Sequence, residues 1–197
     1  MDNDKYRTIK EKAIGEGYYS EKRSKFLAFA HHVESVDDAL RIVRGYKKKY
    51  YDARHCCYAY RVGFKGREFR ANDDGEPSST AGKPILGQID SNGLTNILVC
   101  VIRYYGGINL GTGGLIVAYR EAAFDAISHC EIEERFIEER IKFSFTYPMM
   151  NNVMRIIKEM DLNIINGQFD NTCEITLSVR KSKVEELRSR LSKLSFE

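Results

Sequence analysis

This sequence of 197 residues lacks the features that mark membrane and secreted proteins. Its most apolar run, "NILVCVI" at residues 96–102, has the length of a strand, whereas a membrane helix needs about 20 apolar residues. The charged first residues, "MDNDKYRTIKEK", contain no apolar core of a signal peptide. We therefore expect a cytoplasmic protein that does not partner with a membrane.

Recognisable metal and cofactor motifs are also missing. The five cysteines form no CxxC pair, which argues against a zinc ribbon or a disulfide framework and favours reduced, buried thiols. His31 and His32 point to opposite faces of an expected strand and cannot chelate one ion together. No complete nucleotide-binding motif is present. We therefore expect neither a metal site nor a cofactor.

The composition is that of an ordinary globular protein, with 43% hydrophobic and 30% charged residues. The net charge is +3, and its excess lies in the first part of the chain. Residues 1–130 hold 20 lysines and arginines against 16 aspartates and glutamates. This mild excess permits contact with an acidic partner but does not require it.

Strand and helix patterns fill the first two thirds of the chain. "SKFLAFAHHV" has strand periodicity, with Phe26 and Ala28 on one face and Leu27 and Phe29 on the other. Residues 34–50 predict a helix capped by Ser35. The expected strands are residues 6–13, 24–33, a hairpin within 54–73, and 95–105; further helices are expected within 73–89 and over 113–130.

A charged segment, "EIEERFIEER" at residues 131–140, marks a break in composition. It is consistent either with a solvated extension of the preceding helix or with an edge strand. Beyond it the pattern predicts strand, helix, two strands and helix, the order of a split β-α-β unit. We therefore divide the chain into an N-terminal domain, residues 1–136, and a C-terminal domain, residues 137–197.

Two loops carry the chemistry that the sequence suggests. "RYYGGINLGTGGL" (residues 103–115) lies between a strand and a helix, where glycine N–H groups hold phosphate, yet it lacks the Lys-Ser/Thr of a Walker A loop. "NDDGEPSSTAGKP" (residues 72–84) offers carboxylates for a divalent cation and hydroxyls and a lysine for phosphate. Structural explanations stay open for both: close helix packing for the first, and a turn with Ser79 or Thr80 as helix cap for the second.

Tyrosines and arginines near the first loop suggest a surface that stacks bases and binds phosphate. Tyr104, Tyr105, Arg103 and Arg120 belong to this group, although tyrosine is also an ordinary strand residue. His55 and Cys57 share one strand face, but a packed pair is favoured over a catalytic one. The candidate ligand-binding residues are Asp74, Glu76, Ser78, Thr80, Lys83, Arg103, Tyr104, Tyr105, Gly106, Gly107, Asn109, Gly111, Thr112, Gly113 and Arg120.

Taken together, "DDGEPSSTAGKPILGQI", "NILVCVIRYYGGINLGTGGL" and "AYREAA" resemble the Impact/YigZ family, and the chain resembles its two-domain bacterial members. The resemblance implies an α+β fold, with an N-terminal domain like the second domain of a small-subunit ribosomal protein and a ferredoxin-like C-terminal domain. It also implies a role in translation, because eukaryotic members interfere with the activation of a stress-sensing kinase. Asn109 and Val117 replace basic residues common in the family, which removes charge beside the glycines.

Three functions follow from these observations. The first is a non-catalytic cytoplasmic binding protein that regulates translation by contacting RNA, the ribosome or a translation factor. The second is an enzyme that acts on a nucleotide or phosphorylated substrate, with Asp74 or Glu76 holding Mg²⁺ or acting as base. The third is a pure protein-interaction module. The first is preferred, catalysis is not expected, and the oligomeric state stays open.

Overall fold

The computed structural model describes residues 4–170 and 172–194 and contains a mixture of helices and strands in three sheets. Its strands are β1 (Lys5–Ile9), β2 (Gly15–Glu21), β3 (Ser24–His32), β4 (His55–Val62), β5 (Glu68–Asn72), β6 (Ile97–Tyr104), β7 (Ile132–Phe136), β8 (Glu138–Thr146), β9 (Asn163–Phe169) and β10 (Thr172–Arg180). Its α-helices are α1 (Val36–Lys49), α2 (Gly82–Ser91), α3 (Gly111–Ser128), α4 (Met150–Glu159) and α5 (Val184–Leu194). Short 3-10 helices lie at Phe64–Gly66, Tyr147–Met149 and Lys181–Lys183.

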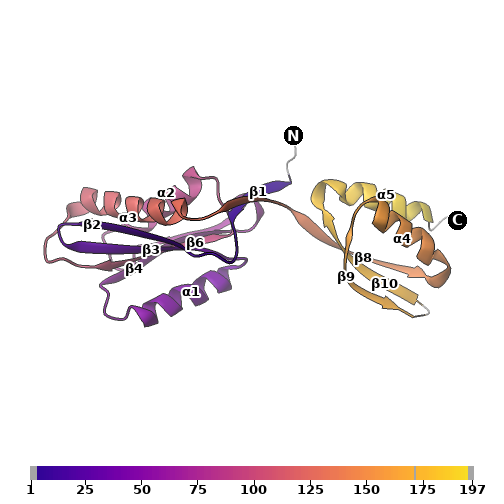
Figure 1. Ribbon diagram of the computed structural model, residues 1–197, viewed down its shortest axis with the longest axis horizontal. Coiled ribbons are helices and arrows are strands. Elements are labelled where there is room, and N and C mark those ends of the chain that lie inside the picture. Colours follow the sequence, from indigo (N-terminus) through magenta and orange to yellow (C-terminus); the bar gives the residue numbers. More distant parts are fainter. Residues whose placement is uncertain (1–3, 171, 195–197) are drawn as a thin grey trace. The chain divides into compact units, whose positions relative to one another are not determined.

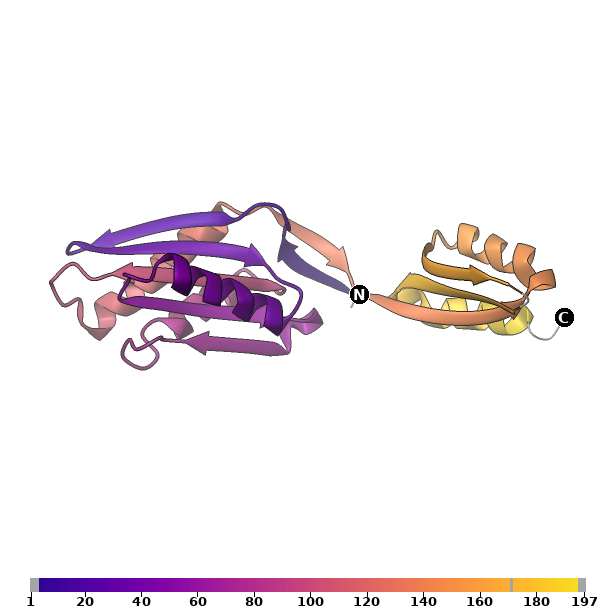
Figure 2. The ribbon, with the colours of Figure 1, turned by 90° about the horizontal axis from the view of Figure 1, so that it is seen from below.

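The chain separates into two compact units. The N-terminal unit is Tyr6–Arg135, and the C-terminal unit runs from Phe136 to the end of the described chain and includes Asp4 and Lys5. The segment 131–140 forms strands β7 and the start of β8 rather than a helical extension. β7 pairs with β1, so residues far apart in sequence lie side by side (Figure 2).

A five-stranded antiparallel sheet, in the order β2-β3-β6-β4-β5, forms the centre of the N-terminal unit. Helices α2 and α3 cover one face and α1 covers the other (Figure 1). The alternation expected for β3 is confirmed, since Phe26 and Ala28 contribute to the core under α2 and α3. Ser35 caps α1 as expected, accepting a hydrogen bond from the Asp38 N–H at 3.1 Å.

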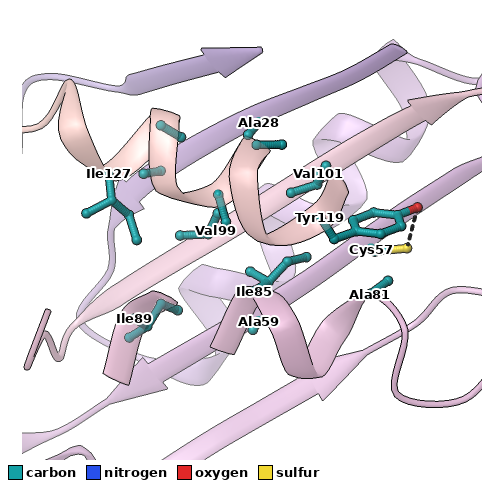
Figure 3. Packing of buried hydrophobic residues seen from close by; sticks show 14 of the residues in the cluster. Ala28, Cys57, Ala59, Ala81, Ile85, Ile89, Val99, Val101, Tyr119 and Ile127 are labelled. Carbon is teal, nitrogen blue, oxygen red and sulfur yellow. Dashed lines mark hydrogen bonds between the residues drawn. The ribbon is translucent and has the colours of Figure 1, made fainter. Parts of the chain in front are cut away.

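The core beneath α2 and α3 consists of small and branched residues that let the helices approach the sheet closely (Figure 3). Ala59, Val99 and Val101 come from the strands, and Ile85 comes from α2. Tyr119 of α3 is the largest fully buried side chain in the N-terminal unit, and its hydroxyl lies 3.3 Å from the Cys57 sulfur. This polar group reaches the end of the core that borders the candidate site.

The C-terminal unit is a three-stranded antiparallel sheet in the order β8-β10-β9. Its apolar face, which includes Ile175, Leu177 and Val179 of β10, packs against α4 and α5. The opposite face of β10 carries polar residues such as Glu174 and Thr176, as expected for a sheet with one solvated face. No described helix is long and apolar enough to span a membrane.

Candidate functional site

The candidate site is a cavity of about 660 Å³ where β4 and β6 meet the N-terminus of α3. Its walls come from four segments distant in sequence. The antiparallel register of β4 and β6 places His55 opposite Arg103, which brings these two side chains together. The lining residues are Arg54, His55, Glu76, Pro77, Arg103, Tyr105, Asn109, Leu110, Gly111, Thr112 and Leu115.

A buried ion pair lies at the floor of the cavity. Arg103 Nη1 donates to Glu76 Oε1 over 2.6 Å, and both side chains are almost completely shielded, with 6% and 3% of their surface exposed. The Tyr119 hydroxyl donates to the same carboxylate oxygen over 2.7 Å. Glu76 is therefore held by two donors, and breaking this arrangement would leave a charge buried without its partner.

Some of the polar groups around Glu76 have hydrogen-bond partners and others do not. His55 places Nε2 at 3.7 Å from Glu76 Oε2, while its Nδ1 lies 2.7 Å from the Asp74 carbonyl oxygen. Arg103 Nε is buried and has no hydrogen-bond partner among the described residues. Burial raises the pKa values of Cys57 and Tyr119 far above their usual range, so both stay protonated beside the carboxylate.

In the acidic loop, residues 73–82, the Asp73 carboxylate accepts hydrogen bonds from the backbone of the loop itself. Asp73 Oδ1 accepts hydrogen bonds from the N–H groups of Ala81 (3.1 Å) and Gly82 (2.8 Å), and its Oδ2 accepts from Ser79 N–H (2.9 Å). The cap of α2 is thus the distant Asp73, and the expectation of Ser79 or Thr80 was wrong. Thr80 instead donates to the Pro77 carbonyl.

Asp74 is likewise occupied by contacts within the protein. Its Oδ2 accepts from the Cys56 N–H at 2.7 Å, and its Oδ1 pairs with Lys47 of α1. These contacts tie the acidic loop to the edge of the sheet and to α1. The carboxylates of this loop therefore serve the fold first, which is the structural explanation that the sequence had left open.

The glycine loop, residues 105–111, leads into an α3 N-terminus that no side chain among the described residues caps. The Tyr105 hydroxyl donates to Asn109 Oδ1 at 3.0 Å, which links the two sides of the loop. Gly106 is required by close packing, because a Cβ there would lie 2.1 Å from the Arg23 carbonyl carbon. The first N–H groups of α3, at Gly111, Thr112 and Gly113, have no partner inside the helix and carry its positive dipole end.

The cavity gathers six of the residues selected from the sequence and excludes the others. Glu76, Arg103, Tyr105, Asn109, Gly111 and Thr112 line it. The remaining candidates do not: Asp74, Ser78, Thr80, Lys83, Tyr104, Gly106, Gly107, Gly113 and Arg120. Besides Asp74 and Thr80, two more of these are engaged elsewhere, since Tyr104 donates to Asp52 at 2.9 Å and Arg120 pairs with Glu121 at 3.2 Å.

Sequence reasoning missed Arg54, His55 and Tyr119 as parts of this site. His55 shares a strand face with Cys57 and Ala59, and Arg103 shares one with Val99 and Val101. In each strand the site residue lies on the same face as core residues two and four positions away. This pattern could have pointed to the site, but only if the pairing of β4 with β6 had been known.

A family model, the Impact N-terminal domain, matches residues 22–127, which include every residue of this cavity. The chain belongs to the Impact family. Among its Impact relatives, the family member YigZ of Escherichia coli is 31% identical over 88% of this chain and 86% of its own length. The member YvyE of Bacillus subtilis is 29% identical over 96% of this chain and 87% of its own length.

Solved structures give a consistent result for the fold. A crystal structure described as a hypothetical protein aligns with 98% of this Impact chain and 93% of its own length, at 28% identity and a TM-score of 0.76. The two-domain translational regulator Yih1 aligns with 62% of this chain and 49% of its own length, at 23% identity. Its TM-score is 0.41, a similarity too low to support an argument.

Proposed function

We propose that this Impact family member is a binding protein that regulates translation, and that its N-terminal unit holds a phosphate group of RNA in the cavity at the start of α3. One observation carries the proposal: the uncapped N-terminus of an 18-residue helix faces the same cavity as Arg54 and Arg103. Helix N–H groups together with guanidinium groups form a common phosphate site.

The charges in the cavity support an anionic ligand. Glu76 neutralises Arg103, whereas no described ion pair occupies Arg54, an exposed residue at the rim. Tyr105 lies beside these groups with 48% of its surface exposed, and Arg103 stacks on its ring at 5.5 Å. An exposed ring next to a phosphate site is suited to stacking a base of single-stranded RNA.

Family membership supports the link to translation, because a role there is what the resemblance to this family implies. The finer fold assignment belongs to the same proposal. The strand order β8-β10-β9, with α4 and α5 on one face, supports a ferredoxin-like C-terminal unit. The antiparallel sheet with helices on both faces supports an N-terminal unit like the second domain of a ribosomal protein.

The test measures binding of the full chain to single-stranded RNA and to ribosomes over a range of salt concentrations. We expect association at low salt that weakens steeply as salt rises. Arg54→Gln should lower the affinity and reduce the salt slope by about one. Arg44→Gln is the matched control, since it removes the same charge from an exposed site on α1, across the sheet.

Two results would contradict the proposal: no association at low salt, or an equal loss from Arg54→Gln and Arg44→Gln. A pull-down from cell extract with and without RNase separates RNA from protein partners. Capture that survives RNase and still depends on Arg54 would instead support the protein-interaction module.

A specific observation also supports an enzyme as a second candidate. Glu76 and His55 both line the cavity, with His55 Nε2 3.7 Å from Glu76 Oε2, and such pairs perform acid–base chemistry in many enzymes. A thermal-shift screen with nucleotides and Mg²⁺ tests this candidate, because a bound substrate raises the melting temperature. Absence of any stabilisation would count against it.

A further inference from the structure

A second cluster of polar side chains lies apart from the cavity, where β1 and β3 end. Glu11 follows β1, His32 is the last residue of β3, and Glu34 precedes α1. One ligand atom from each side chain lies within 4.8 Å of the others. None of these residues lines the cavity described above.

His32 is oriented in a way that leaves one ring nitrogen without a partner. Its side chain is 4% exposed, and its Nδ1 lies 3.0 Å from the Thr8 hydroxyl. That hydroxyl also lies 3.4 Å from the Asn96 carbonyl, to which it can donate its own proton while accepting from Nδ1–H of His32. In that tautomer Nε2 keeps a lone pair.

The Nε2 lone pair faces the two carboxylates. Nε2 is buried, has no hydrogen-bond partner among the described residues, and lies 4.0 Å from Glu11 Oε1. A carboxylate cannot donate a hydrogen bond to it, so the close approach leaves three electron-pair donors facing one another. A buried acceptor without a partner is destabilising, and a cation between the three groups would remove that cost.

The state of the imidazole agrees with this geometry. Burial lowers the pKa of His32 and the nearby Arg135 lowers it further, while Glu11 and Glu34 oppose this shift without cancelling it. Neutral imidazole is the form that binds metal. The hydroxyl on Nδ1 corresponds to the outer hydrogen bond that usually orients a metal-binding histidine.

The carboxylates remain available. Glu34 is exposed and forms no ion pair within the described part of the chain. Glu11 Oε1, the oxygen that lies 4.0 Å from His32 Nε2, also pairs with Arg135 at 2.9 Å, and half of the Glu11 side chain is exposed. A cation would therefore share the Glu11 carboxylate with this arginine. The carboxylates of Glu11 and Glu34 carry two negative charges and Arg135 carries one positive charge, and the resulting net negative charge favours a divalent cation.

We propose that Glu11, His32 and Glu34 bind a zinc ion, with solvent completing the coordination. The nitrogen ligand and the number of protein ligands favour zinc, whereas calcium and magnesium take oxygen ligands, and calcium more of them. The ion would join the turn after β1 to the end of β3. It would thereby fasten the β1–β7 ribbon to the central sheet.

The test measures zinc binding to the full chain after treatment with a chelator, using competition with a fluorescent zinc indicator under non-thiol reducing conditions. We expect one zinc ion per chain. His32→Gln and Glu34→Gln should each weaken binding by about tenfold or more. Glu34→Gln is the safer variant for folding, because Glu34 is exposed.

Matched controls are His129→Gln and Glu16→Gln, which alter an exposed histidine and an exposed glutamate outside the cluster. NMR of the histidine ring nitrogens supplies a second readout, since zinc should shift Nε2 of His32 and leave His129 unchanged. The proposal is overturned by a lack of stoichiometric binding at micromolar zinc. Unchanged affinity in both cluster variants overturns it too, because the ion would then bind elsewhere on the chain.

Discussion

The two helices that cover one face of the central sheet begin in opposite ways. The N-terminus of α2 is closed by Asp73, which accepts three backbone N–H groups. The N-terminus of α3 has no side-chain cap and opens into a cavity beside Arg103. Side-chain hydrogen bonds thus satisfy backbone N–H groups at the start of α2, whereas none of the described side chains does so at the start of α3.

This contrast divides the two loops by role. The acidic loop has the carboxylates of a cation site, but they bind other groups of the protein. Asp73 accepts from the loop backbone, Asp74 pairs with Lys47, and Glu76 pairs with Arg103. The glycine loop has few side chains and directs backbone donors outward. A loop rich in charged residues is therefore the structural one here, and the loop with little charge is the better candidate for ligand binding.

The largest expected effect comes from removing the one carboxylate that the acidic loop contributes to the cavity. Glu76→Ala leaves the buried Arg103 without its partner, and we expect a loss of about 3–5 kcal/mol in the free energy of unfolding. Urea unfolding measures it. Glu121→Ala, at an exposed ion pair on α3, should change stability by less than about 0.5 kcal/mol. Equal stability of the two variants would contradict the prediction.

The next largest effect tests the closed helix terminus. Asp73→Ala removes three hydrogen bonds from the start of α2, and we expect a loss of about 2 kcal/mol, at the upper end for a helix cap. Ser78→Ala in the same loop is the control, because Ser78 is exposed and should be neutral. If the two variants unfolded at the same urea concentration, Asp73 would not be the cap that the geometry indicates.

A third change makes the open terminus resemble the closed one. A side chain at Gly113 would meet no atom within 4 Å, so Gly113→Asp adds a carboxylate at the start of α3 without a clash. We expect an unchanged or slightly higher melting temperature, since an acidic residue there gains about 0.5 kcal/mol. RNA binding should fall, because the added charge repels phosphate.

Gly87→Asp is the control for this change, because it adds the same charge in open space on α2. Its RNA binding should stay near that of the unchanged chain. A loss of RNA binding in Gly113→Asp together with retained stability cannot come from unfolding. Retained RNA binding in Gly113→Asp would remove the α3 terminus from the proposed phosphate site.

The sequence predicted the elements whose signals are local and missed those that depend on contacts between distant segments. The faces of β3, the strand β6 and the Ser35 cap all follow from short local patterns, and the structure confirms them. Strand β2 was missed because its glycines weaken the strand pattern. Gly17 is needed there, since a Cβ would lie 2.3 Å from the Ala126 backbone nitrogen of α3.

The candidate site shows the same limit. The glycine loop and Arg103 were identified from sequence, because the loop follows an apolar strand and precedes a helix. The Asp73 cap was missed because the capping residue lies six to nine positions before the N–H groups that donate to it. Glu11, His32 and Glu34 match no spacing motif, and they meet only after β1 has packed beside β3.

The smallest expected effect concerns the hydroxyl that links the two sides of the glycine loop. Tyr105→Phe removes its hydrogen bond to Asn109 but keeps the ring beside the Arg103 guanidinium. Because the bond is exposed to water, we expect a change in stability below about 0.5 kcal/mol. RNA affinity should also persist if the ring stacks on a base, whereas Tyr105→Ala should lower it. Equal RNA binding by the Phe and Ala variants would show that the ring is not a stacking surface and leave phosphate binding to the α3 terminus and Arg54.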